Sequence, residues 1–314
     1  MNFLNQANDL RLEFGNDKSP KLSNFNVAAI IAFLDYEGNV QTIEGCNSEP
    51  CSLTGSICAE RCALTSLRML PYKKLLGVYI VTDSERPIMP GLLCREYMSS
   101  YPLDELDPRT FDVLVAGINE DGSVRENSLI KSNLNLLYPA KSCWSGLRIS
   151  SVVERKTEIS SMVSSMVDDY LTLNDDPDFN LIYECALDSS RSATSQFFGL
   201  NYSAAVMLED GSVVHSKQII AMEYGCSIDP IAMLAKEISE GKKKIRSVVL
   251  VDSLGAVHAP FAIGRSFLSE HTGEEGIAWY SDWEGRPLES SLVLKSIAVA
   301  DLCPLKPDFK NDLC

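Results

Sequence analysis

Four of the ten cysteines lie close together, between Cys46 and Cys62. The first residues carry no apolar run typical of a signal peptide, so we expect a cytoplasmic protein, in which cysteines serve as buried thiols, metal ligands or nucleophiles. Glu60 stands two residues after Cys58 in a stretch whose pattern predicts a helix. The first turn of that helix places a carboxylate close to a thiol, and the helix N-terminus stabilises a thiolate. Groups at this spacing can bind a metal ion and move protons beside it.

Residues 45–61 carry the most specific pattern in the chain, GCNSEPCSLTGSICAER. It resembles the pattern of the cytidine deaminase family, which is roughly G-C-N-x-E-N-A-S-Y-x-x-x-x-C-A-E-R and aligns without a gap. The matching residues are Asn47, Glu49, Ser52, Cys58, Ala59, Glu60 and Arg61. Upstream, SNFNVAA (23–29) is similar to the family's S-x-F-x-V-G-A, and downstream PGLLCRE (90–96) is similar to P-C-x-x-C-R-Q. The resemblance covers most of residues 20–140.

The resemblance implies a zinc-dependent hydrolytic deaminase with its site in this part of the chain. Cys58 and Cys94 would be zinc ligands, and zinc lowers the pKa of a bound water to about 7, which makes it a nucleophile at neutral pH. Glu60 would move protons from that water to the ring and to the leaving amine, as in zinc deaminases as a class. The resemblance also implies four residues in contact with the nucleoside: Asn47 and Glu49 at the ribose hydroxyls, Phe25 near the base, and Ala59.

The chain departs from the family pattern at one metal position, where Gly91 replaces the first cysteine of P-C-x-x-C. Catalytic zinc normally takes three protein ligands and a water, so two thiolates are not enough. All three histidines lie in the second half of the chain. Cys51 is the candidate for the missing ligand, because it replaces the family's pocket-lining alanine; the alternative is a small buried cysteine without a metal. Arg61 either donates to the ligand sulfurs, as in relatives with all-thiolate sites, or is an exposed helix arginine.

The second half of the chain repeats the first, and this repeat predicts the fold. Three pairs of segments match in pattern and in order: 26–40 with 201–214, 74–84 with 244–254, and 89–98 with 259–268. Each half contains a hairpin pattern, a helical pattern, a buried strand and a second helix. Helices that alternate with strands indicate the α/β class, here as tandem three-layer α/β/α domains of the cytidine deaminase type with mixed sheets.

We predict a catalytic cytidine deaminase domain at 1–146, a linker helix at 147–180 and a degenerate deaminase-like domain at 181–314. The second half has Asp229, Pro230 and Ile231 where Cys-Ala-Glu is expected, and Phe261 and Gly264 in place of the two cysteines of P-C-x-x-C. This arrangement resembles the bacterial and plant two-domain cytidine deaminases, whose second domain is inactive. The resemblance implies a homodimer in which the second domains help to wall the active site.

Composition and charge narrow the possible partners. The 314 residues are 45% hydrophobic and 23% charged, which is typical of folded globular proteins. A net charge of −15 opposes binding to nucleic acid or to an anionic membrane surface. No apolar run in the sequence is long enough for a membrane span. We therefore expect a small-molecule partner, without nucleic acid or membrane.

The resemblance and the charge together predict one function and leave two alternatives. We predict that the chain deaminates cytidine and 2′-deoxycytidine to uridine and 2′-deoxyuridine plus ammonia, in pyrimidine salvage. One alternative is a catalytically inactive scaffold or nucleoside-binding subunit, which Gly91 favours and the intact Asn47, Glu49 and Glu60 oppose. The other is a polynucleotide deaminase, which needs a basic groove that the acidic composition opposes.

Overall fold

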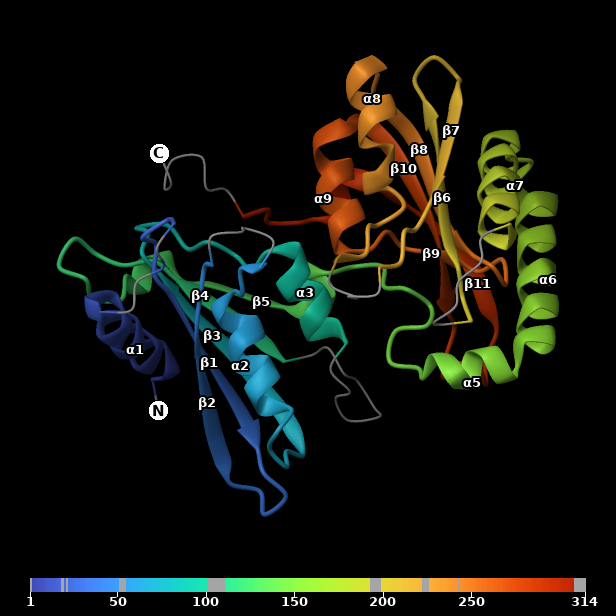
Figure 1. Cartoon of the computed structure of the whole chain (residues 1–314). Helices are drawn as coiled ribbons and strands as arrows, with labels where there is room; N and C mark the ends of the chain where they lie inside the picture. The colour runs from blue at the N-terminus through green and yellow to red at the C-terminus, as the bar shows by residue number, and fades with distance from the viewer. Residues whose placement is uncertain are drawn as a thin grey trace. The chain divides into compact units, whose positions relative to one another are not determined.

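The structure is a computed structural model that describes residues 2–17, 20, 22–50, 55–100, 111–192, 199–221, 226–241 and 243–307. The chain divides into two compact units (Figure 1): unit 1 comprises Met1–Tyr138 and Leu305–Cys314, and unit 2 comprises Pro139–Pro304. Each unit has a mixed sheet with helices on both faces, which confirms the predicted α/β class. Among the described residues, no helix is long and apolar enough to cross a bilayer.

The sheet of unit 1 has the strand order β2-β1-β3-β4-β5. Its strands are β1 (Val27–Leu34), β2 (Val40–Cys46), β3 (Lys74–Thr82), β4 (Asp112–Ala116) and β5 (Ile130–Asn133). β1 and β2 form the antiparallel hairpin predicted from 26–40, and Gly38 in its turn has a φ of 87°, which glycine adopts without strain. β3 and β4 pair in parallel, whereas the other neighbours are antiparallel.

Helices cover both faces of this sheet, because β1 is apolar on both. The helices of unit 1 are α1 (Phe3–Asp17), α2 (Ala59–Leu67), α3 (Leu92–Ser99), η2 (Glu126–Ser128) and α4 (Leu134–Leu137). Ala28 and Ile30 of β1 pack in one cluster with α1, whereas Ala29 and Ile31 pack in another with α2 and α3. Successive side chains of a strand point to opposite faces, so the unbroken apolar run of β1 fits a strand that is buried on both sides.

The sheet of unit 2 has the order β11-β10-β8-β6-β7, and β9 pairs with β8. Its strands are β6 (Tyr202–Leu208), β7 (Val213–Lys217), β8 (Ile245–Asp252), β9 (Val257–His258), β10 (Thr272–Trp283) and β11 (Leu292–Ala298). Its helices are α5 (Ile149–Glu154), α6 (Lys156–Asn174), α7 (Pro177–Arg191), η4 (Ala232–Leu234), α8 (Ala235–Gly241), α9 (Ala262–His271) and η5 (Val299–Leu302). α6 and α7 pack on one face of β6 and β8, and η4, α8 and α9 pack on the other.

The segment 147–180, expected to be a linker, is instead part of unit 2. α6 and the start of α7 fall within it, and Ile159 and Phe179 are buried in the same cluster as Val249 of β8. β8 is buried on both faces, so its second face needs this helical cover. The turn-rich stretch after residue 173 connects α6 to α7, and Asp176 caps α7 by accepting from the backbone N–H of Phe179.

The repeat in the sequence is also a repeat in the strand pairing. In unit 1, Val27 at the start of β1 lies opposite Thr82 at the end of β3. In unit 2, Tyr202 at the start of β6 lies opposite Asp252 at the end of β8. Both pairs are antiparallel, and each sheet adds its parallel strand on the other side of β3 or β8. Position 82 in unit 1 therefore corresponds to position 252 in unit 2.

The two arginines that the repeat aligns make the same contact. Arg95 donates from Nε to the carbonyl oxygen of Pro90 at 2.7 Å, and Arg265 donates from Nε to that of Pro260 at 2.7 Å. Both side chains are almost fully buried. Their other nitrogens donate to backbone carbonyls of Leu137 and Leu305 for Arg95, and of Pro139, Ala140 and Leu302 for Arg265. A buried guanidinium thus fixes the start of α3 and of α9.

Candidate active site

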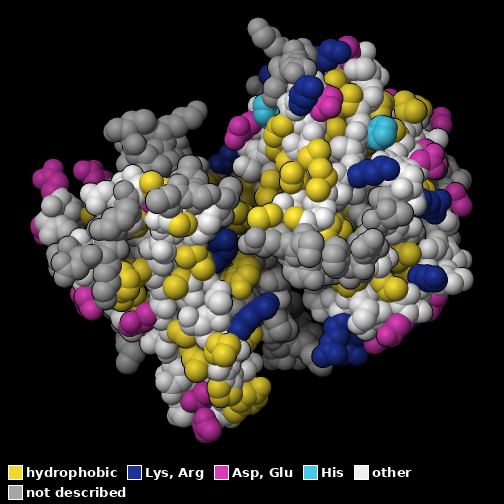
Figure 2. All heavy atoms as spheres, viewed as in Figure 1, with side chains coloured by type: hydrophobic (Ala, Val, Ile, Leu, Met, Phe, Trp, Pro, Cys, Tyr) yellow, Lys and Arg dark blue, Asp and Glu magenta, His cyan; other side chains and the backbone are white. Residues whose placement is uncertain are grey.

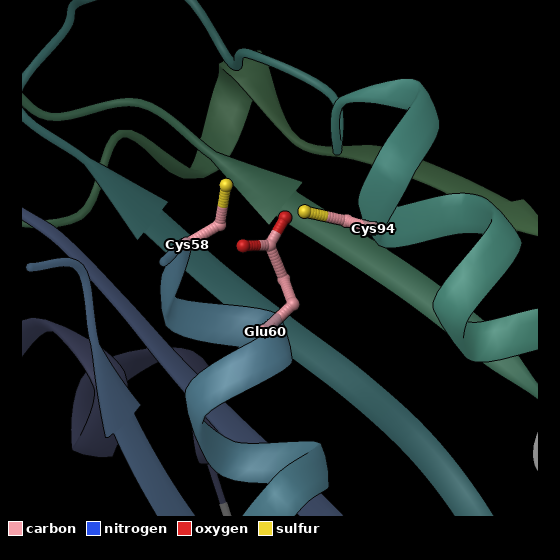
Figure 3. Close-up of side chains that lie close together, drawn as sticks. All are labelled: Cys58, Glu60 and Cys94. Carbon is pink, nitrogen blue, oxygen red and sulfur yellow. The ribbon is translucent and has the colours of Figure 1, made fainter. Parts of the chain in front are cut away.

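Cys58, Glu60 and Cys94 converge at the beginnings of two helices (Figure 3). Cys58 is the N-cap residue of α2, in extended conformation, and Glu60 lies in the first turn of the same helix. Cys94 lies in the first turn of α3. The two sulfurs and a carboxylate oxygen of Glu60 all lie within 4.8 Å of one another, and no other such group of three occurs among the residues that the structure describes. The carboxylate of Glu60 points between the two sulfurs.

The thiol of Cys58 is placed where a thiolate is stabilised. It stands at the N-terminus of α2, whose dipole favours negative charge. A hydrogen bond with Cys94 and one from Arg61, whose Nη2 lies 3.8 Å from Sγ, lower the pKa of Cys58 to about 6. The same hydrogen bond with Cys58 and burial raise the pKa of Cys94. Cys58 is therefore the thiol of the pair that forms a thiolate more readily.

Arg61 is held in place by the backbone next to the site. Its Nη2 donates to the carbonyl oxygen of Ser56 at 2.9 Å, in addition to its contact with Cys58. The side chain is partly buried. Of the two interpretations left open by the sequence, the contact with a ligand sulfur is the one that the geometry favours.

Glu60 is a buried carboxylic acid. It is 4% exposed, and burial followed by the nearby charge of Cys58 raises its pKa to about 7. Desolvation disfavours the charged form of a carboxyl group, and a neighbouring thiolate adds to this effect. A group with such a pKa can both accept and release a proton near neutral pH, which is what a general acid and base requires.

A cavity of about 220 Å³ opens beside this cluster. Its lining includes Phe25, Asn47, Glu49, Cys58, Glu60 and Gly91. Predicted site residues from two separate segments, 23–29 and 45–61, are thus brought together in one pocket, whereas the buried Cys94 is not part of its described lining. Ala59, which the resemblance implied as a substrate contact, is fully buried and does not appear in the described lining of the cavity. A larger hollow of about 550 Å³ shares Asn47 and Glu49 but contains neither Cys58 nor Glu60.

Asn47 is used mainly to shape the cavity. Its Oδ1 accepts from the backbone N–H of Val27 at 2.9 Å, and its Nδ2 donates to the carbonyl oxygen of Phe25 at 2.8 Å. These two bonds fix the chain that enters β1, and with it the aromatic ring of Phe25, which is 8% exposed. Among the described residues these two groups are the only partners of the Asn47 amide, which has two N–H groups and two lone pairs.

Glu49 lies toward the solvent side of the cavity. Its carboxylate accepts from the backbone N–H of Ser23 at 2.9 Å and from the Ser23 hydroxyl at 2.8 Å. Ser23 was not singled out from the sequence, although its place two residues before Phe25 in SNFNVAA was a usable signal. A carboxylate held in this way keeps further lone pairs for the hydroxyl groups of a sugar.

Gly91 occupies the helix start where the family pattern has cysteine. It is the N-cap of α3 with φ −62° and ψ 161°, which any residue adopts. A Cβ atom added to Gly91 would meet nothing within 4 Å. Neither backbone strain nor crowding therefore requires glycine at this position, and the space that a third thiol would occupy is open to the cavity.

The donor set fits a zinc ion with one ligand still to be supplied. Two thiols, one of them with a lowered pKa, and an adjacent carboxyl group are the groups that zinc binds or uses in catalytic sites. Cys51, the candidate third ligand, lies in 51–54 outside the described residues. The buried hydroxyl of Ser56, next to that segment, has no hydrogen-bond partner among the residues that the structure describes.

The corresponding place in unit 2 is filled. The isolated bridge between Ser48 and Ile57 is repeated by that between Ile219 and Ile228, so the residue after Ile228 corresponds to Cys58. That residue is Asp229, whose Oδ1 accepts from two backbone N–H groups at the start of the following helical turn. At this position unit 2 therefore has a carboxylate that caps a helical turn, where unit 1 has the thiol of Cys58.

Gly264, the counterpart of Cys94, lies against apolar and polar neighbours. An added Cβ there would come within 2.9 Å of Ile231, the fully buried counterpart of Glu60, and within 3.1 Å of Oδ1 of Asp229. The space in which unit 1 holds its sulfurs and carboxylate is thus occupied in unit 2.

Comparisons with known proteins find similarity among solved structures. No protein-family model matches the chain, and no curated protein matches it. Cytidine deaminase from Mycobacterium tuberculosis is 23% identical, with 41% of this chain and 96% of that protein covered and a TM-score of 0.33. Cytidine deaminase from Burkholderia pseudomallei is 26% identical, with 44% of this chain and 94% of that protein covered and a TM-score of 0.33. Cytidine deaminase from Mycobacterium leprae is 18% identical, with 41% of this chain and 99% of that protein covered and a TM-score of 0.34. Over 41% to 44% of its length the chain is therefore similar to bacterial cytidine deaminases, the group that residues 45–61 resemble.

Proposed function

We propose that unit 1 hydrolytically deaminates cytidine and 2′-deoxycytidine to the corresponding uridines and ammonia. The observation that carries the proposal is the convergence of two thiols and a buried carboxyl group, of which Cys58 and Glu60 line a cavity that also contains Asn47 and Glu49. Each of these residues stands at a matched position of the motif that resembles cytidine deaminases. Such a reaction consumes a salvaged nucleoside, which accords with the pathway predicted from the sequence.

Cys58 and Cys94 would hold zinc, and we propose Cys51 as the third ligand. Zinc in this position supplies a water of lowered pKa and a Lewis acid next to C4 of the pyrimidine. Glu60 takes the proton of the attacking water on its carboxylate oxygen and passes it to N3 of the ring. The water oxygen bonds to C4 in the same step. Glu60 then moves the remaining proton of this C4 hydroxyl to the exocyclic nitrogen, the bond from C4 to nitrogen breaks, C4 becomes a carbonyl, and ammonia leaves. Burial of Glu60 excludes bulk water from these transfers.

The substrate that the cavity favours is a single nucleoside. Glu49 and the free amide groups of Asn47 face the solvent side of the cavity, where ribose hydroxyls would bind, and the buried ring of Phe25 would contact the base. A polynucleotide needs a basic groove for its phosphates. The net charge is −15, and on the face of unit 2 in Figure 2 Lys and Arg side chains are interspersed with Asp and Glu.

The test follows the loss of cytidine absorbance together with the zinc content of the purified protein. We expect about one zinc per chain, activity in the wild type, and an inactive Glu60→Gln variant that keeps its zinc. Glu237→Gln, at an exposed position of α8, is the matched control and should keep full activity. A folded wild type without zinc or activity would instead support the inactive alternative. Faster turnover of a cytidine-containing oligonucleotide than of cytidine would support the polynucleotide alternative.

A further inference from the structure

Thr82 places a buried side chain that carries a hydroxyl group in the wall of the cavity. It is the last residue of β3, it lines the cavity, and it is 2% exposed. Its Oγ1 has no hydrogen-bond partner among the residues that the structure describes. Buried hydroxyl groups in proteins almost always have a partner, and each exception calls for an explanation.

The surroundings of Thr82 are apolar. Ile80 lies on the same face of β3, because side chains alternate along a strand, and both residues line the cavity. Val27 lies opposite Thr82 in the sheet and also lines the cavity, together with the buried Ile88. The hydroxyl is therefore the single polar side-chain group in a wall formed by Val27, Ile80, Thr82 and Ile88.

The apolar wall around Thr82 lies away from the part of the cavity where the sugar of a nucleoside would bind. Glu49 and its partner Ser23 lie on the exposed side, whereas Glu60 is buried at the reacting end. A nucleoside with its reacting carbon next to Glu60 places its base inside and its sugar at the mouth. Thr82 and Glu60 both line the cavity and are both buried, which in this pose assigns Thr82 to the base and not to the sugar.

Unit 2 provides an internal comparison at the corresponding position. Asp252 stands there, fully buried, and the protein itself supplies its hydrogen-bond donors. Oδ2 of Asp252 accepts from Nε1 of Trp144 at 2.6 Å and lies 3.0 Å from Nε2 of His258. Oδ1 accepts from the backbone N–H groups of Leu254 and Ala256. A polar group at this point of the fold is thus satisfied from within in unit 2 and left to an outside partner in unit 1.

We propose that Thr82 is a specificity-determining residue whose hydroxyl exchanges a hydrogen bond with a polar atom on the edge of the bound nucleobase. The inference rests on the proposed function, since it takes the ligand of the cavity to be a pyrimidine nucleoside. Without a ligand the hydroxyl is a buried group that lowers stability, and with a ligand it is paired. Thr82 therefore favours the occupied cavity over the empty one.

The test uses Thr82→Val, which keeps the shape and removes the hydroxyl. We expect the KM for cytidine to rise about five- to tenfold, the size of one lost hydrogen bond, with kcat changed less than about twofold. The KM for 2′-deoxycytidine should rise by the same factor, because the hydroxyl contacts the base. The unfolding midpoint of the free protein should rise, and the further increase caused by excess uridine should shrink.

Three controls separate this role from a structural one. Thr82→Ser keeps the hydroxyl and should retain the wild-type KM, whereas Thr82→Ala should show the same raised KM as Thr82→Val. If Thr82→Val does not fold, the comparison of the serine and alanine variants takes its place. Thr272→Val removes another buried hydroxyl without a described partner, in unit 2, and should leave both KM values unchanged. An unchanged KM in folded Thr82→Val or Thr82→Ala would overturn the inference. A wild type that neither binds uridine nor deaminates cytidine would overturn the proposed function itself.

Discussion

Moving a cysteine from position 51 to position 91 would test where the third metal ligand lies. Cys51→Ala removes the proposed ligand, and Cys51→Ala/Gly91→Cys restores a thiol at the position that the cytidine deaminase pattern uses. Gly91 permits this change because its φ is −62° and an added Cβ has no neighbour within 4 Å. At the N-cap of α3 the new thiolate would also be favoured by the helix dipole, by about 0.3–1 kcal/mol.

The expected effects on zinc affinity are large. Loss of an outer hydrogen-bond partner of a zinc ligand already costs 10- to 100-fold in affinity. Loss of a ligand should exceed that, so we expect Cys51→Ala to weaken zinc binding at least 100-fold, or about 2.8 kcal/mol. The double variant should recover most of this affinity and part of the activity. Gly91→Cys alone should bind zinc with four thiolates, which leaves no position for water, and should be inactive.

Zinc per chain at buffered free zinc measures the affinity, and thiolate absorption bands of the cobalt-substituted protein report the number of sulfurs bound. Circular dichroism verifies that each variant is folded. Cys226→Ala, at an exposed position in unit 2, is the control and should change nothing. Wild-type zinc affinity in Cys51→Ala would refute Cys51 as a ligand. A folded double variant that does not regain zinc would refute the inference that a thiol at position 91 reaches the space beside Cys58 and Cys94.

Three further predictions concern stability and binding. In the metal-free protein the pKa of Glu60 lies at about 7 instead of 4.5. The free energy of unfolding should therefore fall by about 3 kcal/mol as the pH rises from about 4.5 through 7. Urea unfolding at a series of pH values measures this fall, which the Glu60→Gln variant should lack. Arg265→Lys cannot reach all the carbonyls that the guanidinium contacts and should lower the free energy of unfolding by about 3 kcal/mol, whereas the exposed Arg286→Lys should leave it unchanged. Glu49→Gln should raise the KM for cytidine at least about tenfold, because a charged acceptor is lost, with kcat preserved in steady-state assays.

The sequence sufficed for the first hairpin and the following buried strand of each unit, because these elements depend on local patterns. The hairpin at 26–40 follows from apolar runs around a turn, and the match of Arg95 with Arg265 revealed the repeat before any contact was known. Cys58 and Glu60 share one helix start, so their proximity follows from helix geometry alone. Their approach to Cys94 depends on how the neighbouring helix packs. The hydrophobic periodicity does not predict this packing, and the proximity of Cys94 is predicted from the resemblance to the family motif.

Other features escaped prediction because they depend on tertiary contacts. α1 covers one face of the first sheet with a short stripe that includes Leu4, Ala7 and Leu10, too weak a pattern to identify by itself. The segment 147–180 has the amphipathic pattern of any surface helix, and only the apolar second face of β8 explains why it packs in unit 2. The partnerless hydroxyl of Thr82 has no sequence signal, since the same residue type ends many strands with its hydroxyl bonded.

The two units share one fold but differ at corresponding buried positions, where they carry different polar or apolar groups. Unit 1 keeps a buried acid at Glu60, a hydroxyl at Thr82 without a partner among the described residues, and open space beside Gly91. Groups of this kind lower the stability of the empty protein. Unit 2 has Ile231 and a fully bonded Asp252 at the corresponding points. Natural proteins tolerate such destabilising groups mainly where binding or catalysis needs them. Their concentration around one cavity, and their replacement at the equivalent place in the same chain, support unit 1 as the place of the proposed reaction, and this support does not depend on the motif.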